Sequence, residues 1–287
     1  MEVFPSNGPL GATIAGVDLS TDVSAVDKGR IVKAFLDHMV IVFPNQKLDY
    51  HDMLRLSEVF GPRGKTSNEL MGLGRRGYLN DDIPDGITII SNIRNEAGAL
   101  IGSLGNAEAW WHTDSSFTEE PISASLLHAL EVPYEGGETE FLNMAQAFDD
   151  MPTHLAAKID GKIANHSKIH SPDGTRRPAF EDVSDPSKAP GTTHPMVRTH
   201  PQTGRKCLYL GVRRHSYITG MAVPESEALL DEIWAHTCQG KYVWSQKWTV
   251  GDLVVWDNRC TMHHRNSFPA QSRRLMIKSI TAGEAVT

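Results

Sequence analysis

The chain has 287 residues, of which 40% are hydrophobic and 22% charged, and its formal net charge at pH 7 is -7. This is the composition of an ordinary globular protein, and the acidic balance argues against a nucleic-acid partner, because neutralising phosphates requires a basic surface. No apolar run approaches the length of a membrane span, the N-terminus lacks the basic start and apolar core of a signal peptide, and the three scattered cysteines do not suggest a disulfide framework. We therefore expect a cytoplasmic protein.

The N-terminal part of the chain alternates short apolar runs with amphipathic segments. The pattern predicts a strand within Gly11–Leu19, a helix over Ala25–Asp37, and a strand at Met39–Phe43 that is closed by a turn. A second helix, with Met53 and Leu56 on its apolar face, is expected to end before Gly61.

The middle and the C-terminal third are rich in strand-like runs. We expect strands at Thr88–Ile93, Ser123–Val132, Glu138–Asn143, Ile163–Ile169, Met196–Thr199, Lys206–Leu210, Tyr242–Lys247, Leu253–Trp256 and Arg274–Thr281. Pro224 opens a helix that Gly240 closes. The polar, proline-containing segment Ser171–Thr193 is expected to be a long loop, of the kind that often forms a lid. Many strands and few helices, without a linker, predict one mainly β domain over 1–287, a barrel or sandwich with helices outside.

The chemistry of this chain is expected to centre on a histidine and a carboxylate two residues apart. On a strand, His112 and Asp114 would face the same side and could converge on one ion. His263, just after the apolar run Leu253–Trp256, would supply a second imidazole. Two histidines and one carboxylate form the facial triad of non-haem Fe(II) sites. The spacing alone is a weak signal, and a polar pair at the end of a strand explains it equally well.

Several longer segments resemble the taurine and 2,4-dichlorophenoxyacetate dioxygenase family. The stretch Trp111–Phe117, with the sequence WHTDSSF, is similar to the family's iron-binding segment, and Gly136–Phe141 resembles its GGDT segment. Trp256–His263, with the sequence WDNRCTMH, resembles the family segment that ends in the distal iron ligand. Leu10–Leu19 and His194–Pro201 also look like family segments, so the resemblance covers nearly the whole chain in order.

The resemblance implies a double-stranded β-helix, or jelly roll, with flanking helices and with Fe(II) at its mouth. It implies that 2-oxoglutarate and O2 are consumed and that succinate and CO2 are released. The residues that it implies are His112, Asp114 and His263 for iron, and Thr139 and Arg274 for 2-oxoglutarate. The bulky Trp256 is expected to form a wall of the pocket, although core packing explains a strand tryptophan equally well. Because the metal carboxylate Asp114 is present, hydroxylation or oxidative cleavage is expected rather than halogenation.

Either of two adjacent histidines could supply the second imidazole, as far as chemistry alone can tell. His263 and His264 are adjacent, and adjacent strand residues face opposite ways, so only one can reach the metal. The family spacing selects His263.

The substrate is expected to be a small organic anion, although its identity does not follow from the sequence. The family's sulfonate-binding arginine falls four residues after Arg274, where this chain has Lys278, and Glu108 stands at a position where relatives often have asparagine. A lysine is still a cation, but a point charge rather than a fork. Further candidates for the substrate pocket are His200, Arg213, Arg214 and His215.

Lys278 is the strongest of these candidates, because Arg274, Met276 and Lys278 alternate and should share one face of the final strand. A lysine in an enclosed pocket needs an anionic partner. With Asp114 committed to iron, we expect a substrate anion to be that partner, with Glu108 as the alternative.

Two other classes of function remain open at this point. A cupin-like metal-dependent hydrolase or isomerase would use a similar barrel but would not need Thr139 and Arg274 at these positions. A non-catalytic protein that binds small acids would be expected to lose a metal ligand, and none is lost. In each case we expect a homo-oligomer without nucleic-acid or membrane partners.

Overall fold

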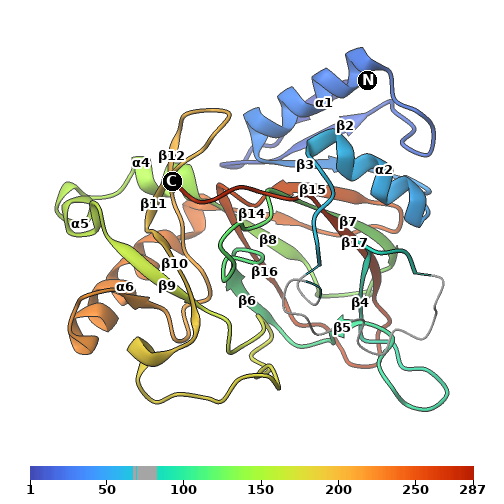
Figure 1. The fold of residues 1–287 in the computed structure, drawn as a ribbon. Helices are drawn as coiled ribbons and strands as arrows, with labels where there is room; N and C mark the ends of the chain where they lie inside the picture. Colours follow the sequence, from blue (N-terminus) through green and yellow to red (C-terminus); the bar gives the residue numbers. More distant parts are fainter. Residues whose placement is uncertain (67–68, 70–82) are drawn as a thin grey trace.

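The computed structural model describes residues 1–66, 69 and 83–287, and in this part of the chain it is mainly β with few helices (Figure 1). The largest sheet has eight strands. In spatial order they are β1 (Glu2–Pro5), β2 (Ala12–Ala15), β3 (Val40–Phe43), β15 (Leu253–Asp257), β7 (Ala124–Glu131), β17 (Leu275–Ile280), β4 (Thr88–Ser91) and β5 (Ser103–Leu104).

A second sheet and two small sheets complete the β structure. The four-stranded sheet has the order β14 (Val243–Gln246), β8 (Thr139–Asn143), β16 (Thr261–Arg265) and β6 (Ala109–His112). A three-stranded sheet contains β10 (Gly191–Pro195), β9 (Ile163–Ser167) and β13 (Tyr217–Ile218). A two-stranded sheet pairs β11 (Val197–Thr199) with β12 (Lys206–Leu208).

The helices lie outside these sheets (Figure 1). They are α1 (Ala25–His38), α2 (Tyr50–Phe60), α4 (Met144–Asp149), α5 (Thr153–Ile159) and α6 (Val223–Thr237), with 3-10 turns η1 (Pro186–Lys188) and η2 (Gly240–Tyr242). Local capping explains where two of them begin. The Ser24 side chain accepts a hydrogen bond from the Asp27 amide, and Asp49 and Asp52 form a capping box at the start of α2.

Strand β15 separates the two hydrophobic cores, because successive side chains of a strand point to opposite faces. Leu253 and Val255 pack in the cluster that contains the buried residues of α1 and α2. Val254 and Trp256 pack in a second cluster with residues of β8 and β16. The eight-stranded sheet is therefore covered by helices on one face and by the four-stranded sheet on the other.

Most of the elements expected from the sequence are present, with shifted ends. The strand expected within Gly11–Leu19 is shorter than that range and spans Ala12–Ala15. The short helices α4 and α5 were not expected. The expectation of an unbroken loop over Ser171–Thr193 is wrong at its end, where η1 forms and β10 begins at Gly191. The backbone of β10 pairs with β9, which compensates for the lack of apolar side chains in this stretch.

Cys207, Cys238 and Cys260 are all free thiols. None of the helices in the described part of the chain combines the length and apolar composition that a bilayer crossing requires.

The buried centre of β15 offers a test of this architecture. Val255 is 0% exposed between β3 and β7, whereas Val250 is 55% exposed. Val255→Ala should lower the free energy of unfolding by about 1.5–3 kcal/mol, because it removes two methyl groups from a packed core and leaves a cavity. Val250→Ala is the matched control and should change it by less than about 0.5 kcal/mol. Urea denaturation measures both, and equal effects would contradict the described packing.

Candidate metal centre and cosubstrate site

Three potential metal ligands meet where β6 and β16 pair. His112 is the last residue of β6, and it lies opposite His263 in the register of β16. The Nε2 atom of His112 is 3.6 Å from Oδ1 of Asp114, and the Nε2 atom of His263 is 3.9 Å from Oδ2. One ligand atom from each residue lies within 4.8 Å of the others. A single ion can contact all three after small side-chain adjustments.

The carboxylate reaches this place by a turn, so the expectation that Asp114 shares a strand face with His112 is wrong. Strand β6 ends at His112, and Asp114 stands in the turn that follows, where Ser115 has a φ of 53°. Asn258 holds this turn. Its Oδ1 accepts a hydrogen bond from the Asp114 amide at 2.9 Å, and its Nδ2 donates to the Asp114 carbonyl at 2.8 Å.

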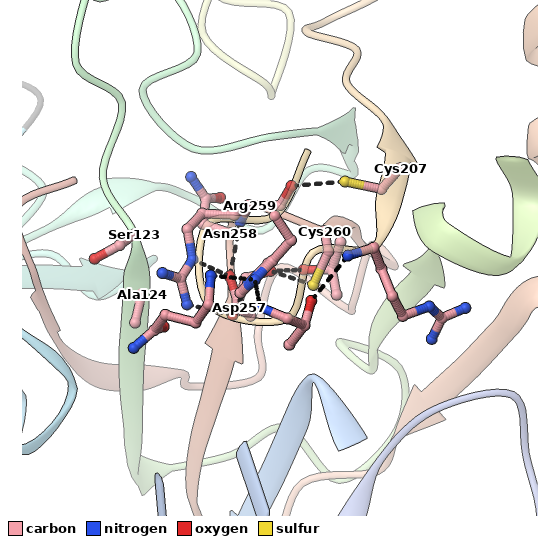
Figure 2. A network of polar contacts seen from close by, with 12 residues as sticks. Ser123, Ala124, Cys207, Asp257, Asn258, Arg259 and Cys260 are labelled. Carbon is pink, nitrogen blue, oxygen red and sulfur yellow. Dashed lines mark hydrogen bonds and ion pairs between the residues drawn. The ribbon is translucent and has the colours of Figure 1, made fainter. Parts of the chain in front are cut away.

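Asn258 is itself fixed by the tight turn that joins β15 to β16 (Figure 2). Arg259 donates from Nε and Nη2 to the two carboxylate oxygens of Asp257, at 2.8 and 2.6 Å. His200 donates from Nε2 to Asp257 at 2.9 Å, and the Cys207 thiol approaches the Arg259 carbonyl. Burial alone would raise the pKa of Asp257, but Arg259 and His200 hold it at about 2. The turn is therefore a satisfied ionic network.

The charge states of the three donors suit a divalent cation. Burial by itself would raise the pKa of Asp114, but Lys278, His263 and His112 hold it well below its ordinary value. Burial, followed by the neighbouring His112, lowers the pKa of His263 well below its ordinary range. The Nδ1–H of His112 donates to the Trp110 carbonyl at 2.6 Å, which leaves Nε2 with a free lone pair. Deprotonated donors are what metal binding requires.

Lys278 has a partner that the sequence reasoning set aside. Its Nζ lies 2.5 Å from Oδ2 of Asp114 and 5.3 Å from the ring centroid of the buried Trp256. Ser125 donates a second hydrogen bond to the same Oδ2 at 2.9 Å. The expectation that only a substrate or Glu108 could neutralise Lys278 is therefore wrong. Trp256 does border these groups, since its ring centroid is 4.8 Å from that of His263.

His264 points away from the other three donors, as the alternation of the strand predicts. Its Nε2 lies 2.6 Å from Oε1 of Glu108, and its Nδ1 lies 3.3 Å from Oε2 of Glu140. Glu108 thus contacts His264 and does not reach Lys278, because His264 and Lys278 lie on opposite sides of the four-stranded sheet.

Two buried arginines near this centre have unpaired N–H groups. Arg274 is 1% exposed, and its Nε and Nη1 have no hydrogen-bond partner among the described residues. Burial and the neighbouring Arg265 lower the pKa of Arg274 to about 9. Arg265 also has an unpaired Nε and Nη1 within the described part of the chain. Buried cations without partners are costly, so this region is suited to an anion.

Thr139 lies beside Arg265 in the register of β8 and β16. Its hydroxyl accepts a hydrogen bond from Nε1 of Trp248 at 3.0 Å, which leaves the hydroxyl hydrogen free to donate. Sequence reasoning selected Thr139 and Arg274 but missed Arg265. The signal was available, since Arg265 follows His263 by two residues and a strand places such residues on one face.

Two neighbouring cavities share part of their walls, and the smaller of them borders the centre. The smaller, of about 150 Å³, is lined by His112, Asp114 and Lys278 together with apolar side chains. The larger, of about 650 Å³, shares Ser103, Leu104, Ser171 and Arg177 with it. Arg177 was not singled out from the sequence, because nothing in its polar surroundings distinguishes it from a surface arginine.

Four of the expected substrate residues are engaged elsewhere. His200 belongs to the ionic turn of Asp257, and Arg213 pairs with Glu227 and Asp231 on α6. His215 lies 3.4 Å from Asp182, which also pairs with Arg214 at 3.0 Å. The two cavities described above are not lined by these residues. The sequence could not predict whether these loop residues face the cavities, because a loop has no regular alternation of its side chains.

Comparisons with known proteins agree with this geometry. The profile of the family described as "Taurine catabolism dioxygenase TauD, TfdA family" matches residues 2–279. The chain is 30% identical to an alpha-ketoglutarate-dependent 2,4-dichlorophenoxyacetate dioxygenase of Cupriavidus pinatubonensis, with 98% of each chain covered. It is 28% identical to an alpha-ketoglutarate-dependent sulfate ester dioxygenase of Pseudomonas putida, covering 99% of this chain and 90% of that one.

A solved structure shows the same likeness in three dimensions. The crystal structure of AAD-2 in complex with Mn(II) and N-oxalylglycine superimposes with a TM-score of 0.81 at 28% identity, covering 100% of this chain and 99% of that one. The family profile spans nearly the whole sequence and contains both strands that carry the histidines. The chain therefore belongs to the TauD, TfdA dioxygenase family.

Proposed function

We propose that this protein is an Fe(II)- and 2-oxoglutarate-dependent dioxygenase that oxidises a small organic anion and releases succinate and CO2. The observation that carries the proposal is the convergence of His112, Asp114 and His263, together with the buried Arg274, whose Nε and Nη1 have no hydrogen-bond partner among the described residues. Family membership supports the reaction class.

The donor set fits Fe(II) on its own chemistry. Two imidazoles and one carboxylate leave open positions on iron for ligands that react. His112 has its Nδ1 fixed by a backbone carbonyl, and Asp114 has its backbone fixed by Asn258. We propose that these two residues and His263 hold the metal, with Oδ1 of Asp114 as the ligand atom, because Oδ2 already accepts from Lys278 and Ser125.

Bound iron and 2-oxoglutarate would supply the activation of O2 and the oxidative decarboxylation that drives substrate oxidation. The protein's own contribution is positional. Arg274 would hold the distal carboxylate of 2-oxoglutarate through its unpaired N–H groups, and Thr139 would donate its free hydroxyl hydrogen to the same group. Arg265 would add a second positive charge there. Trp256 and the apolar walls would exclude water.

The substrate is proposed to enter the smaller cavity, which is lined by apolar and cationic side chains. Ile90, Leu104, Ile122 and Ile280 would contact its organic part. Lys278 lines the same cavity, and we propose that its charge attracts the anionic part of the substrate while it orients Asp114. Glu108, His200, Arg213 and His215 are no longer proposed as substrate contacts, because each is engaged in a different ion pair.

The same proposal includes the fold type, the number of domains and the role of the segment 171–193. The packing of the four-stranded sheet on the eight-stranded sheet, and the likeness to AAD-2, support a double-stranded β-helix. The two hydrophobic clusters meet along β15, which supports one domain over 1–287. The segment 171–193 contributes Ser171 and Arg177 to the cavity walls, and this supports a role as a lid.

A cupin-like hydrolase and a non-catalytic acid-binding protein are both less well supported. Neither explains a buried Arg274 with unpaired N–H groups close to a complete set of metal ligands. Relatives along the whole chain are named as dioxygenases.

The metal assignment is tested by removing one donor at a time. His112→Ala, Asp114→Ala and His263→Ala should each weaken Fe(II) binding and abolish succinate formation, because three donors are the minimum for this facial set. His264→Ala is the matched control, since its ring faces Glu108 and Glu140, and it should retain iron. Equilibrium dialysis measures the iron content. Loss of iron in His264→Ala but not in His263→Ala would show that the adjacent histidine is the ligand.

The cosubstrate assignment is tested at Arg274. Arg274→Ala should raise the KM for 2-oxoglutarate by roughly 30-fold or more, because it leaves a buried carboxylate without its partner. Iron affinity should hardly change. Arg273→Ala removes an exposed arginine that pairs with Glu131 and should leave the KM unchanged. An unaltered KM in Arg274→Ala would mean that another residue, with Arg265 as the first candidate, holds the distal carboxylate.

The electrostatic role of Lys278 is tested by a neutral side chain of similar length. Lys278→Met should raise the KM for an anionic substrate several-fold more than the KM for 2-oxoglutarate, because the cavity loses one positive charge. It should also increase succinate formation without substrate oxidation. Lys247→Met, at an exposed position, is the control. If Lys278→Met oxidises an anionic substrate as well as the parent does, anion recognition does not depend on Lys278.

A further inference from the structure

Arg177 combines three properties that Lys278 lacks. It stands in the segment 171–193, it lines both cavities, and it has no carboxylate within ion-pair distance among the residues that the structure describes. Lys278, by contrast, is already bonded to Asp114. Of the arginine and lysine side chains that line the smaller cavity in the described part of the chain, Arg177 is therefore the one that remains free to pair with an external anion.

The guanidinium of Arg177 is held in place by neutral groups. Its Nη1 donates to the carbonyls of Lys168 and His170, at 2.8 and 2.7 Å, and its guanidinium carbon lies 4.6 Å from the ring centroid of Phe117. Burial lowers the pKa of Arg177 to about 10, and the attraction of Asp173 opposes this only in part. An arginine stays charged at neutral pH under these conditions, so the wall of the cavity carries a positive charge that Asp173 compensates only in part.

The contacts of Nη1 leave the opposite edge of the group free. No hydrogen bond joins Nε or Nη2 of Arg177 to any residue in the described ranges. These two nitrogens form one side of the planar fork and match the two oxygens of a carboxylate or a sulfate. The loop that carries Arg177 is ordered by the Trp110 amide, which donates to the Pro172 carbonyl at 2.8 Å. The fork is thus preorganised for an anion.

We propose that Arg177 is the direct binding residue for the anionic group of the substrate, at the junction of the two cavities. This inference rests on the proposed oxygenase function and names the chemistry of its substrate, an organic carboxylate or sulfate ester with an apolar body. The anion pairs with the Nε–Nη2 edge of Arg177, and the apolar body extends past Leu104 and Ile90 toward His112 and Asp114. Because Arg177 belongs to the segment 171–193, anion binding also fastens this segment over the site.

The test compares Arg177→Gln with Arg176→Gln, a matched change in the neighbouring arginine. The side chain of Arg176 is 43% exposed, donates to the Phe180 carbonyl and lines only the larger cavity. Calorimetric titrations are made without oxygen, with Fe(II) and 2-oxoglutarate present, using phenoxyacetate, hexyl sulfate and neutral phenoxyacetamide. Arg177→Gln should weaken binding of at least one of the two anions by roughly 30-fold or more and that of phenoxyacetamide by less than about 3-fold. Arg176→Gln should stay within about 3-fold of the parent for every probe.

The two anions separate a planar carboxylate from a tetrahedral sulfate as the preferred group. Arg177→Lys retains the charge without the fork and should bind with intermediate affinity. Limited proteolysis gives an independent measurement. The preferred anion should protect the segment 171–193 in the parent and in Arg176→Gln, but not in Arg177→Gln. Thermal unfolding of each variant shows whether it is folded.

Several outcomes would overturn the inference. These are equal anion affinity in Arg177→Gln and the parent, an equal loss for phenoxyacetamide, or no binding of either anion by a parent enzyme that still forms succinate from 2-oxoglutarate. Failure of the proposed function looks different. In that case the parent forms no succinate with Fe(II) and 2-oxoglutarate under any condition, while Arg177-dependent anion binding is still measured by calorimetry.

Discussion

The tight turn between β15 and β16 positions Asp114 relative to His263 in the candidate metal centre. Asp257 is buried, and its charge is met by the fork of Arg259 and by the imidazole of His200. A buried carboxylate without these partners would be strongly destabilising. Paired with Arg259 and His200, Asp257 stabilises the turn through which the chain passes from the eight-stranded sheet to the four-stranded sheet. Asn258 lies in this turn and His263 follows it on β16, so the turn places both the residue that holds Asp114 and the distal imidazole.

Four buried or half-buried arginines fall into two groups that differ in how their charge is satisfied. Arg259 is fully paired within the turn, whereas Arg274, Arg265 and Arg177 retain free N–H groups in the described part of the structure. A protein with a net charge of -7 thus has an interior region of positive potential beside three metal ligands. Fields inside low-dielectric cavities are weakly screened. This region is suited to two organic anions at once, a cosubstrate and a substrate.

Lys278 illustrates where reasoning from the sequence succeeded and where it stopped. Strand periodicity correctly placed Lys278 on the face that looks toward Trp256 and the metal ligands. The same reasoning discarded Asp114 as a partner because it treated a metal ligand as unable to bond elsewhere. A carboxylate has two oxygens, and here one of them accepts from Lys278 and Ser125. His200, Arg213 and His215 were misplaced for a different reason, since loops have no periodicity from which facing could be inferred.

The sequence by itself determined the mainly β class, the main helices and strands and the pair His112 and His263, because hydrophobic alternation and family-like segments are local signals. It also predicted that only one of His263 and His264 faces the other ligands, since adjacent strand residues point to opposite sides, and the family-like spacing selected His263. Only the tertiary structure decided that Asp114 leaves the strand and is held by Asn258, that Arg265 lies beside Arg274, and that Arg177 reaches the cavity. These facts depend on contacts between segments that lie far apart in the chain. No local pattern encodes the packing that brings such segments together.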